Sequence, residues 1–338
     1  MQDTHISLAH GNGGRYMREL IEEIFARHLA NPELAAPELD IQADAVQIAL
    51  GDGDVLFTTD GFTVQPLEFP GGNIGSLAVH GTTNDLAVAG AIPKYLSLNA
   101  FIEEGLEIAT LERIIKTLAE TAAEIGVKVV CGDTKVLRRG EGGGLYLATT
   151  GVGIRHGHVM SMKNIKHGDA IIVSGPVGDH GIAVMLAREE FGLRGDIQSD
   201  AASVLKLTTS AMTFKGLRFM RDPTRGGIAT VCSELHRATG MGVRLLQENL
   251  PVRDPVQSVC DMLGYDPMYL ACEGRVVAVV DPAEANVLLE TWSGLEEGKN
   301  AAIIGQIDAE IPYVLMQTDI GGERILEELE DDPLPRIC

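Results

Sequence analysis

Residues 73–89 read NIGSLAVHGTTNDLAVA, and this stretch decides how the first half of the chain is organised. Asn73 is a favoured N-cap residue, Gly90 is a favoured helix stop, and Pro93 follows shortly afterwards. These signals predict a helix over residues 74–89.

The predicted helix is made mostly of small residues, so another backbone or a ligand can come close to it. Gly81 lies four residues before Asp85 and therefore shares a helix face with that carboxylate. The neighbours of Asn84 and Asp85 are alanine, leucine and valine, so a packed polar pair is favoured over an ordinary solvated helical face.

Two strands are predicted before this helix, and each carries a carboxylate. The apolar pattern indicates strands over residues 41–50 and 55–59, joined by the turn at residues 51–54. Asp44 falls within the first strand and Asp60 ends the second. Aspartate is disfavoured in strands, so each of the two positions calls for an explanation.

The remainder of the first half alternates strands with one long amphipathic helix. The predicted elements are a strand at 98–103, a helix at 111–125, a strand at 127–131 and a strand at 145–154. The strand at 127–131 runs into Gly132-Asp133-Thr134-Lys135. A polar cluster at the end of a buried strand is where α/β folds place ligand contacts, and an ordinary strand-ending turn is the alternative.

A polar segment between residues 155 and 168 marks the expected domain boundary. After it we expect a strand at 169–174, a loop with His180 and a helix at 182–190. His180 is a candidate acid or base, although a loop histidine is more often simply exposed or capping.

Two further clusters of the second half carry candidate chemistry. Residues 221–227 (RDPTRGG) place Asp222, Arg225 and two glycines before a helix that begins near residue 228, an arrangement suited to metal-bound phosphate. Glu273 precedes a predicted strand at 276–280 and lies beside small apolar residues, so it is either a proton acceptor with a raised pKa or a turn cap.

The two ends of the chain carry the remaining candidates. Residues 10–14 (HGNGG) form a glycine-rich loop before a helical pattern, and such a loop can bind an anion or be an ordinary turn. The chain ends in Pro333-Leu-Pro-Arg-Ile-Cys338, and the prolines favour an extended tail that presents the terminal thiol. A frayed end with an incidental cysteine is the alternative.

Composition narrows the class of protein. The net charge of −21 disfavours nucleic acid and anionic membranes as partners, and it implies a divalent cation if the ligand is a polyphosphate. No apolar run approaches the roughly 20 residues that cross a bilayer. Five cysteines without zinc-site spacing fit reduced thiols, so we expect a soluble, cytoplasmic protein of two domains.

The ordered set of motifs closely resembles the hydrogenase maturation factor HypE family, over nearly the full length of the chain. The matching motifs are residues 10–14 (HGNGG), 66–75 (PLEFPGGNIG), 81–87 (GTTNDLA), 132–135 (GDTK), 178–181 (GDHG), 222–227 (DPTRGG) and 335–338 (PRIC). The wider resemblance is to the ATP-using superfamily that includes aminoimidazole ribonucleotide synthetase and selenophosphate synthetase.

This resemblance implies a two-domain α/β (α+β) synthetase-like fold. Its N-terminal strands would form a dimer-interface barrel, so a homodimer is expected. Residues 1–155 would form an ATP-binding and dimerisation domain, residues 156–320 a C-terminal α/β domain, and residues 321–338 a flexible tail that ends in the acceptor cysteine.

The resemblance also implies an activity, namely ATP-dependent dehydration of a carbamoyl group on Cys338 to a thiocyanate. HypF would supply the carbamoyl group, and the HypC–HypD complex would accept the cyanide during [NiFe]-hydrogenase assembly.

The same resemblance assigns roles to residues. Magnesium is assigned to Asp44, Asp60, Asp85 and Asp222. ATP is assigned to Gly11, Asn12, Gly13, Gly14, Asn84, Asp133, Thr134, Lys135 and Arg225. The proton acceptor is Glu273, with His180 as the second candidate.

Two alternatives stay open from the sequence. One is a selenophosphate or purine synthetase of the same fold, although the former carry a reactive Cys or selenocysteine near the N-terminus and the first cysteine here is Cys131. The other is a nucleotide-binding scaffold whose tail docks partners.

Overall fold

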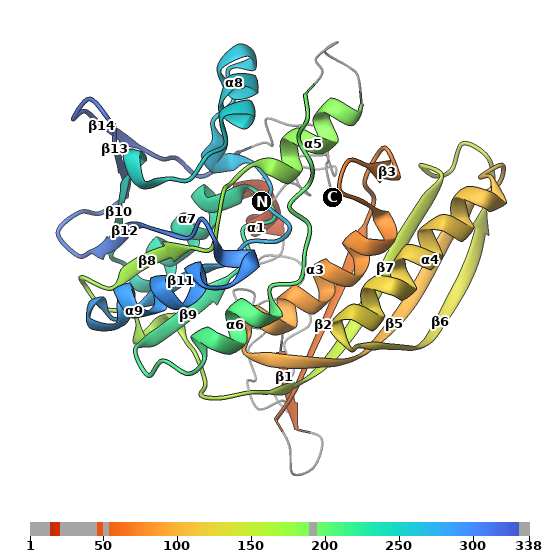
Figure 1. Ribbon diagram of the computed structural model, residues 1–338, viewed down its shortest axis with the longest axis horizontal. Helices are drawn as coiled ribbons and strands as arrows, with labels where there is room; N and C mark the ends of the chain where they lie inside the picture. Colours follow the sequence, from red (N-terminus) through yellow and green to blue (C-terminus); the bar gives the residue numbers. More distant parts are fainter. Residues whose placement is uncertain (1–13, 21–45, 50–53, 189–194, 331–338) are drawn as a thin grey trace.

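The computed structural model describes residues 14–20, 46–49, 54–188 and 195–330. The chain forms two α/β halves, each built on one large sheet (Figure 1). The predicted two-domain α/β architecture is confirmed. A barrel formed between two subunits requires a second chain and stays a prediction.

The N-terminal half is a five-stranded sheet covered on one face by two helices (Figure 1). The strand order is β1-β2-β7-β5-β6, in which only β5 and β6 are parallel. The strands are β1 (Val46–Ala49), β2 (Asp54–Phe62), β7 (Leu145–Arg155), β5 (Ala91–Glu103) and β6 (Lys128–Leu137), and the helices that cover them are α3 (Ile74–Val88) and α4 (Ile108–Ile125). A short ribbon of β3 (Glu68–Phe69) and β4 (Gly72–Asn73) leads into α3, and α1 (Arg15–Leu20) precedes the sheet.

Helix α3 begins at the predicted N-cap. The side-chain oxygen of Asn73 accepts hydrogen bonds from the N–H groups of Gly75 (2.9 Å) and Ser76 (3.1 Å), and Ser76 Oγ accepts from the Asn73 N–H, which completes a capping box. Thirteen of its fifteen residues are buried, so the helix packs on nearly all sides. Helix α4, in contrast, is amphipathic and ends at Gly126, whose φ of 80° is left-handed.

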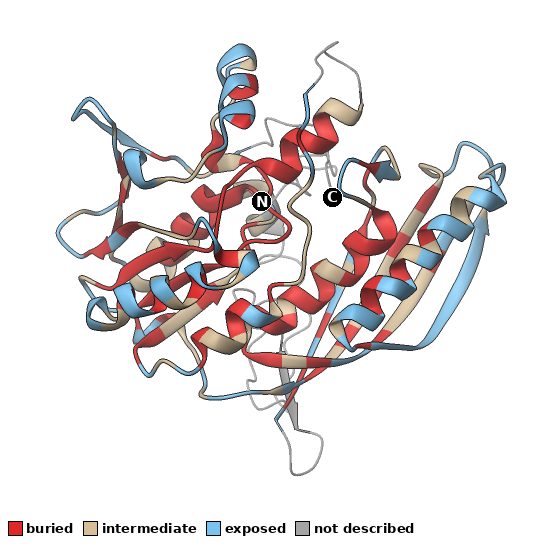
Figure 2. Cartoon of the chain, in the orientation of Figure 1, coloured by how far each residue is buried: buried red, intermediate tan, exposed pale blue. Residues whose placement is uncertain are grey.

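The sequence-based expectation for residues 132–135 is wrong. These residues do not form a turn at the end of a buried strand, because β6 continues through them to Leu137 and pairs in parallel with β5 along its length. Strand β6 is the sheet edge and is almost entirely exposed (Figure 2). Gly132 is required there because a Cβ would lie 2.0 Å from the Leu98 carbonyl oxygen.

The C-terminal half is a seven-stranded sheet of order β14-β13-β10-β12-β8-β11-β9, with helices packed on both faces (Figure 1). Its strands are β8 (Ala170–Val173), β9 (Leu217–Arg221), β10 (Gly242–Leu246), β11 (Val277–Val280), β12 (Ala302–Asp308), β13 (Val314–Gln317) and β14 (Glu323–Ile325). Its helices are α5 (Asp179–Ala187), α6 (Leu205–Ala211), α7 (Gly227–Thr239), α8 (Asp254–Leu263) and α9 (Pro282–Ser293). Short 3-10 segments lie at Met162–Asn164, Gln247–Asn249, Pro267–Tyr269 and Glu296–Gly298.

The central strands of this sheet are buried at every position, which is why their sequences are continuous apolar runs. All four residues of β8 and of β11 are buried, as expected for strands covered on both faces. Strand β7 ends at Arg155 and the C-terminal sheet begins at Ala170, so the expected domain boundary falls between the two sheets.

The expected start of the tail at residue 321 is too early. Residues 323–325 form β14, which pairs with β13, and Leu326 is buried and donates its N–H to the Val314 carbonyl. Residues 323–326 therefore belong to the C-terminal sheet through β14 and the buried Leu326. The last eight residues, 331–338, lie outside the described part of the chain.

The Asn73 cap generates a first prediction. Because Asn73→Ala leaves two helix N–H groups without their side-chain acceptor, we expect it to lower the free energy of unfolding by about 1 kcal/mol, measured by urea denaturation. Glu107→Ala is the matched control, since Glu107 occupies the N-cap of α4 without a side-chain capping bond and its loss should change stability little. Equal destabilisation by the two substitutions would contradict this account.

Candidate active site

Two of the predicted carboxylates of the first half, Asp60 and Asp85, lie on β2 and α3, which are in contact. Thr58 Oγ1 donates a hydrogen bond to Asp85 Oδ2 at 3.1 Å, and the Gly61 N–H donates to Asp60 Oδ1 at 2.8 Å. A Cβ on Gly81 would lie 2.7 Å from the Phe62 ring and 3.6 Å from Asp60 Oδ2. The absence of that Cβ lets α3 lie directly against the strand that carries Asp60.

Three acidic groups from distant parts of the chain interact electrostatically. Burial raises the pKa of Asp60 and of Asp222, the charge of Asp60 raises the pKa of Asp222 further, and the Arg225 guanidinium opposes both shifts. Burial, followed by the charges of Asp222, Asp200 and Asp60, holds the pKa of Glu273 well above its usual range. These residues form one cluster, which joins the end of β2, the loop before α7 and the loop before β11.

Magnesium fits the chemistry of this cluster. Carboxylate oxygens are its preferred protein ligands, and a divalent cation would stabilise the charged carboxylates that burial disfavours. Asp60, Asp85 and Asp222 are the described candidates, whereas Asp44 lies outside the described residues. Within the described ranges, no three His, Cys, Asp or Glu side chains are already gathered as a metal site, so nucleotide oxygens and water would complete the coordination.

Glu273 is 3% exposed, and its main chain is held by two side chains. Its N–H donates to Asp200 Oδ1 at 3.2 Å, and its carbonyl accepts from Asn84 Nδ2 at 3.0 Å. Asn84, expected beside the nucleotide, is itself buried and bonded to the C-terminal half. Its assignment as a nucleotide ligand stays a prediction.

His180 is fully buried, unlike an exposed loop histidine. It lies in the first turn of α5, its Nδ1 is 2.8 Å from Ser199 Oγ, and its ring packs edge-on against Phe69 at 5.5 Å between centroids. These contacts give it a structural environment, and its role as an acid or base stays a prediction.

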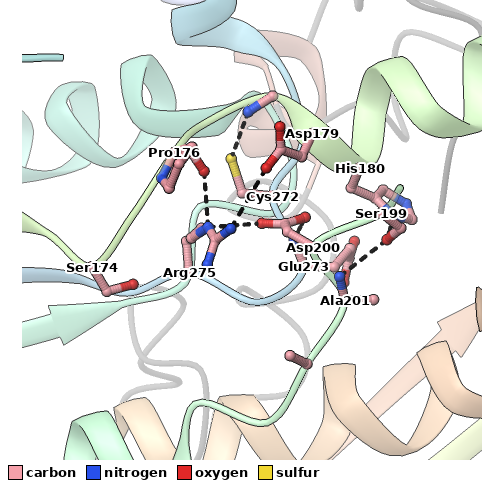
Figure 3. A network of polar contacts seen from close by, with 12 residues as sticks. Ser174, Pro176, Asp179, His180, Ser199, Asp200, Ala201, Cys272, Glu273 and Arg275 are labelled. Atoms are coloured by element: carbon pink, nitrogen blue, oxygen red, sulfur yellow. Dashed lines mark hydrogen bonds and ion pairs between the residues drawn. The ribbon is translucent and has the colours of Figure 1, made fainter. Parts of the chain in front are cut away.

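A buried charge network lies beside Glu273 and was missed by the sequence analysis (Figure 3). Arg275 Nε donates to the Pro176 carbonyl at 2.8 Å and lies 3.2 Å from Asp200 Oδ2, while its Nη2 is 3.6 Å from Asp179 Oδ2. Arg253 approaches Asp179 from the solvent side at 3.3 Å. Burial and the nearby Asp200 charge raise the pKa of Asp179 to about 6 against the opposing arginines.

Asp133, Thr134 and Lys135 do not join this cluster within one chain. They lie on the exposed edge strand β6, where Lys135 Nζ is 3.3 Å from Asp133 Oδ2. Two strands, β7 and β5, separate β6 from β2, so about 14 Å of sheet lies between Lys135 and the strand of Asp60.

The base of the tail packs between Gly14 and the loop at residues 222–227. The Arg15 N–H donates to the Leu329 carbonyl at 2.8 Å, and a Cβ on Gly14 would lie 2.0 Å from that same oxygen. The Leu329 side chain reaches the backbone at Gly226, next to Arg225. Gly11, Asn12, Gly13 and Cys338 lie outside the described residues.

Acidic side chains fasten this base to basic residues on two helices. Glu328 forms ion pairs with Arg18 on α1, at 3.3 Å, and with Arg237 on α7. Glu330 pairs with Arg15 at 3.2 Å. Residues 328–330 are therefore bonded to α1 and α7, and Leu329 lies next to the loop that carries Asp222 and Arg225.

Of the four described cysteines, three are buried and therefore poorly placed to accept a carbamoyl group, and one is exposed. Burial raises the pKa of Cys232 and of Cys260 to about 12, and it raises that of Cys272 well above the usual range. Cys131 is exposed on β6. A reactive thiol is therefore to be sought at Cys131 or at the chain end.

Comparison with known proteins gives a family for the whole chain. Residues 42–155 match the family model "AIR synthase related protein, N-terminal domain", and residues 166–315 match "AIR synthase related protein, C-terminal domain". The chain is 43% identical over 341 residues to the carbamoyl dehydratase HypE of Azotobacter vinelandii, covering 100% of this chain and 98% of that protein.

Solved structures agree. The crystal structure of a HypE–HypF complex matches with a TM-score of 0.84 at 42% identity, covering 92% of this chain and 99% of that chain. A hydrogenase maturation protein HypE in complex with ATP matches with a TM-score of 0.80 at 37% identity, covering 99% and 100%. The two matched domain models correspond to the two sheets, and the relatives match over nearly the whole chain. The chain therefore belongs to the HypE family of hydrogenase maturation proteins.

Proposed function

We propose that this chain is an ATP-dependent carbamoyl dehydratase, a carbon–oxygen lyase that converts a carbamoyl group on its own Cys338 into a thiocyanate. The observation that carries this proposal is the position of the tail base, where Leu329 contacts Gly226 beside Arg225, whose charge acts on Asp60 and Asp222. The eight residues after Glu330 can span up to about 28 Å, which limits how far Cys338 can reach from this base.

The reaction removes the carbamoyl oxygen as phosphate. The thiocarbamate oxygen attacks the γ-phosphorus of ATP and expels ADP, while one N–H proton leaves and a C=N bond forms. The resulting imidoyl phosphate loses its second N–H proton, the C–O bond breaks, and phosphate departs. The products are S–C≡N, ADP and phosphate, so the elements of one water have been taken from the carbamoyl group.

The buried acids divide this work. Asp60, Asp85 and Asp222, together with Asp44, are the proposed magnesium ligands, and the bound magnesium would neutralise charge on the transferred phosphoryl group. Arg225 and the loop at residues 11–14 are proposed to hold phosphate oxygens.

Glu273 is the proposed proton acceptor. Its pKa is held high by burial and by Asp222 and Asp60, so its carboxylate is a stronger base than an exposed one. Cations bound at Asp60 and Asp222 would lower that pKa and leave Glu273 ionised when substrate is present.

A second copy of the chain is proposed to complete the nucleotide site. The face of the N-terminal sheet opposite α3 and α4 carries partly exposed apolar side chains in register, with Phe57 and Tyr95 both opposite Val152. An exposed apolar sheet face is a typical protein interface. A homodimer formed through it would offer the partner subunit's Lys135 to the site.

We further propose that HypF delivers the carbamoyl group, that the HypC–HypD complex receives the cyanide for [NiFe]-hydrogenase assembly, and that both steps take place in the cytoplasm. In the part of the chain that the structure describes, no helix is long and apolar enough to span a membrane.

The proposed reaction predicts a change in mass at the chain end. Carbamoylated protein supplied with Mg-ATP should lose 18 Da from the peptide that ends in Cys338, as measured by mass spectrometry, with release of ADP. Cys338→Ala should fold, bind ATP and give no cyanated product. Cys131→Ala is the control and should react like the parent protein, because Cys131 is exposed but lies on β6. Thiocarbamate that persists with ATP bound would refute the dehydratase assignment.

Glu273→Gln should fold but not dehydrate the carbamoyl group, because glutamine mimics the neutral acid and cannot accept a proton. A raised folded-state pKa stabilises the protein below the unfolded pKa, near 4.5, and this contribution is lost as pH rises toward the folded pKa. Without magnesium or nucleotide, the free energy of unfolding should therefore fall less between pH 5 and pH 8 in Glu273→Gln than in the parent. A dehydrating Glu273→Gln variant would exclude Glu273 as the acceptor.

The proposed dimer is tested on the open sheet face. Tyr95 is 49% exposed on β5, and Tyr95→Glu places a charge in the interface, so we expect the mass measured by light scattering to fall from that of two chains to that of one. Ile108→Glu is the control: Ile108 is an exposed apolar residue of α4, away from that face, and the dimer should persist. Dissociation by both variants, or by neither, would argue against this interface.

A further inference from the structure

The side-chain amide of Asn84 is fully engaged between the two halves of the molecule. Its Nδ2 donates to the Ala202 carbonyl at 2.9 Å and to the Glu273 carbonyl at 3.0 Å, and its Oδ1 accepts from the Val204 N–H at 3.0 Å. Asn84 is 1% exposed. Because both amide hydrogens are already used, this side chain has no donor left for a nucleotide.

The opposite side of Glu273 is held by Asp200. The Glu273 N–H donates to Asp200 Oδ1 at 3.2 Å, while Asp200 Oδ2 lies 3.2 Å from Arg275 Nε (Figure 3). A Cβ on Gly274 would lie 1.9 Å from the Asp200 carbonyl oxygen, so the two segments pass backbone against backbone. Residue 273 is thereby fixed at its N–H, at its carbonyl and at the following residue.

Helix α3 links these contacts to the acidic cluster. Asn84 directly precedes Asp85, which accepts from Thr58, and Gly81 one turn earlier lies against Asp60. A shift of α3 along β2 would therefore move Asp85 and the Glu273 carbonyl together. The helix is buried at thirteen of fifteen positions, so it moves as a rigid body or not at all.

We propose that Asn84 is a positioning residue: it ties the main chain of Glu273 to helix α3, so that the proton acceptor and the carboxylates of the first half keep one fixed geometry. The role given to Glu273 rests on the proposed function. Positioning of this kind matters because misplacing a reacting group by about 1 Å can slow a reaction by roughly a hundredfold.

Two substitutions separate positioning from nucleotide binding. Asn84→Asp keeps the acceptor for Val204 and loses the donors to Ala202 and Glu273, and Asn84→Ala removes all three bonds without adding a charge. At saturating Mg-ATP, the rate constant for loss of water from the carbamoylated chain should fall on the order of tenfold to a hundredfold in both variants. The Kd for ATP should stay within about twofold of the parent value, because the amide has no donor free for a ligand.

Thr83→Val is the matched control. Thr83 is equally buried on the same turn of α3, but its hydroxyl donates to the helix's own Val79 carbonyl at 2.7 Å and does not reach Glu273. It should keep the parent rate. An equal loss of rate in Thr83→Val would assign the effect to general loosening of α3 and overturn the proposal, as would parent-like rates in both Asn84 variants or a loss of ATP affinity in step with the rate.

Hydrogen exchange supplies a readout that does not depend on the reaction. In the intact variants, the peptides that cover residues 199–204 and 271–276 should exchange faster than in the parent, whereas the peptide that covers α9 should be unchanged. Unchanged exchange at residues 271–276 would overturn the positioning role. If the parent protein itself loses no water, the dehydratase proposal fails, and the exchange result still decides whether Asn84 holds Glu273.

Discussion

The close approach of α3 to β2 is the constraint on which the rest of the molecule depends. It exists because Gly81 has no Cβ where Phe62 and Asp60 pack against the helix. The same helix bonds through Asn84 to residues 202, 204 and 273 of the other half. One nearly buried helix of small residues therefore sets the distance between two domains, and a larger side chain on either face would open the site. In this chain the packing of the core and the geometry of the site are one requirement.

Buried negative charge is the second constraint. It opposes the close approach of α3 to β2, because that packing keeps carboxylates away from water. Burial raises the pKa of Asp60, Asp222 and Glu273, and neighbouring carboxylates raise that of Asp222 and Glu273 further. Arg225 opposes these shifts, and Arg221 also opposes the shift at Asp222. Without bound cations, the charged forms of these groups are disfavoured by burial and by one another. A magnesium nucleotide would supply the missing positive charge, so its binding should stabilise the fold as well as set the charge state of Glu273. At Asp179 and Asp200 the positive charge comes from the chain itself, through Arg253 and Arg275.

The sequence predicts those features whose causes are local. The α3 cap at Asn73, the end of α4 at Gly126 and the buried strands β8 and β11 depend on signals within a few residues, and the structure contains them. Strand β6 shows the limit, because whether residues 132–135 end a strand or continue along an edge depends on pairing with β5. Asp200 left no signal at all: it acts on the main chain of a residue 73 positions away, and such a contact requires no recognisable neighbour in sequence. The acidic cluster was found from its motifs, whereas the buried network that supports it was not.

The anchored base of the tail changes how the terminal cysteine should be understood. A tail free from residue 321 would search a large volume, and its terminal thiol would meet the acidic cluster rarely. The contacts of Leu329 with Arg15 and Gly226, and of Glu328 with Arg18 and Arg237, confine that search to the reach of eight residues. Shortening a tether raises the effective concentration of the group it carries, so the anchor favours reaction within the chain over exchange with free thiols. The ion pairs of Glu328 and Glu330 hold the base of this tail in place.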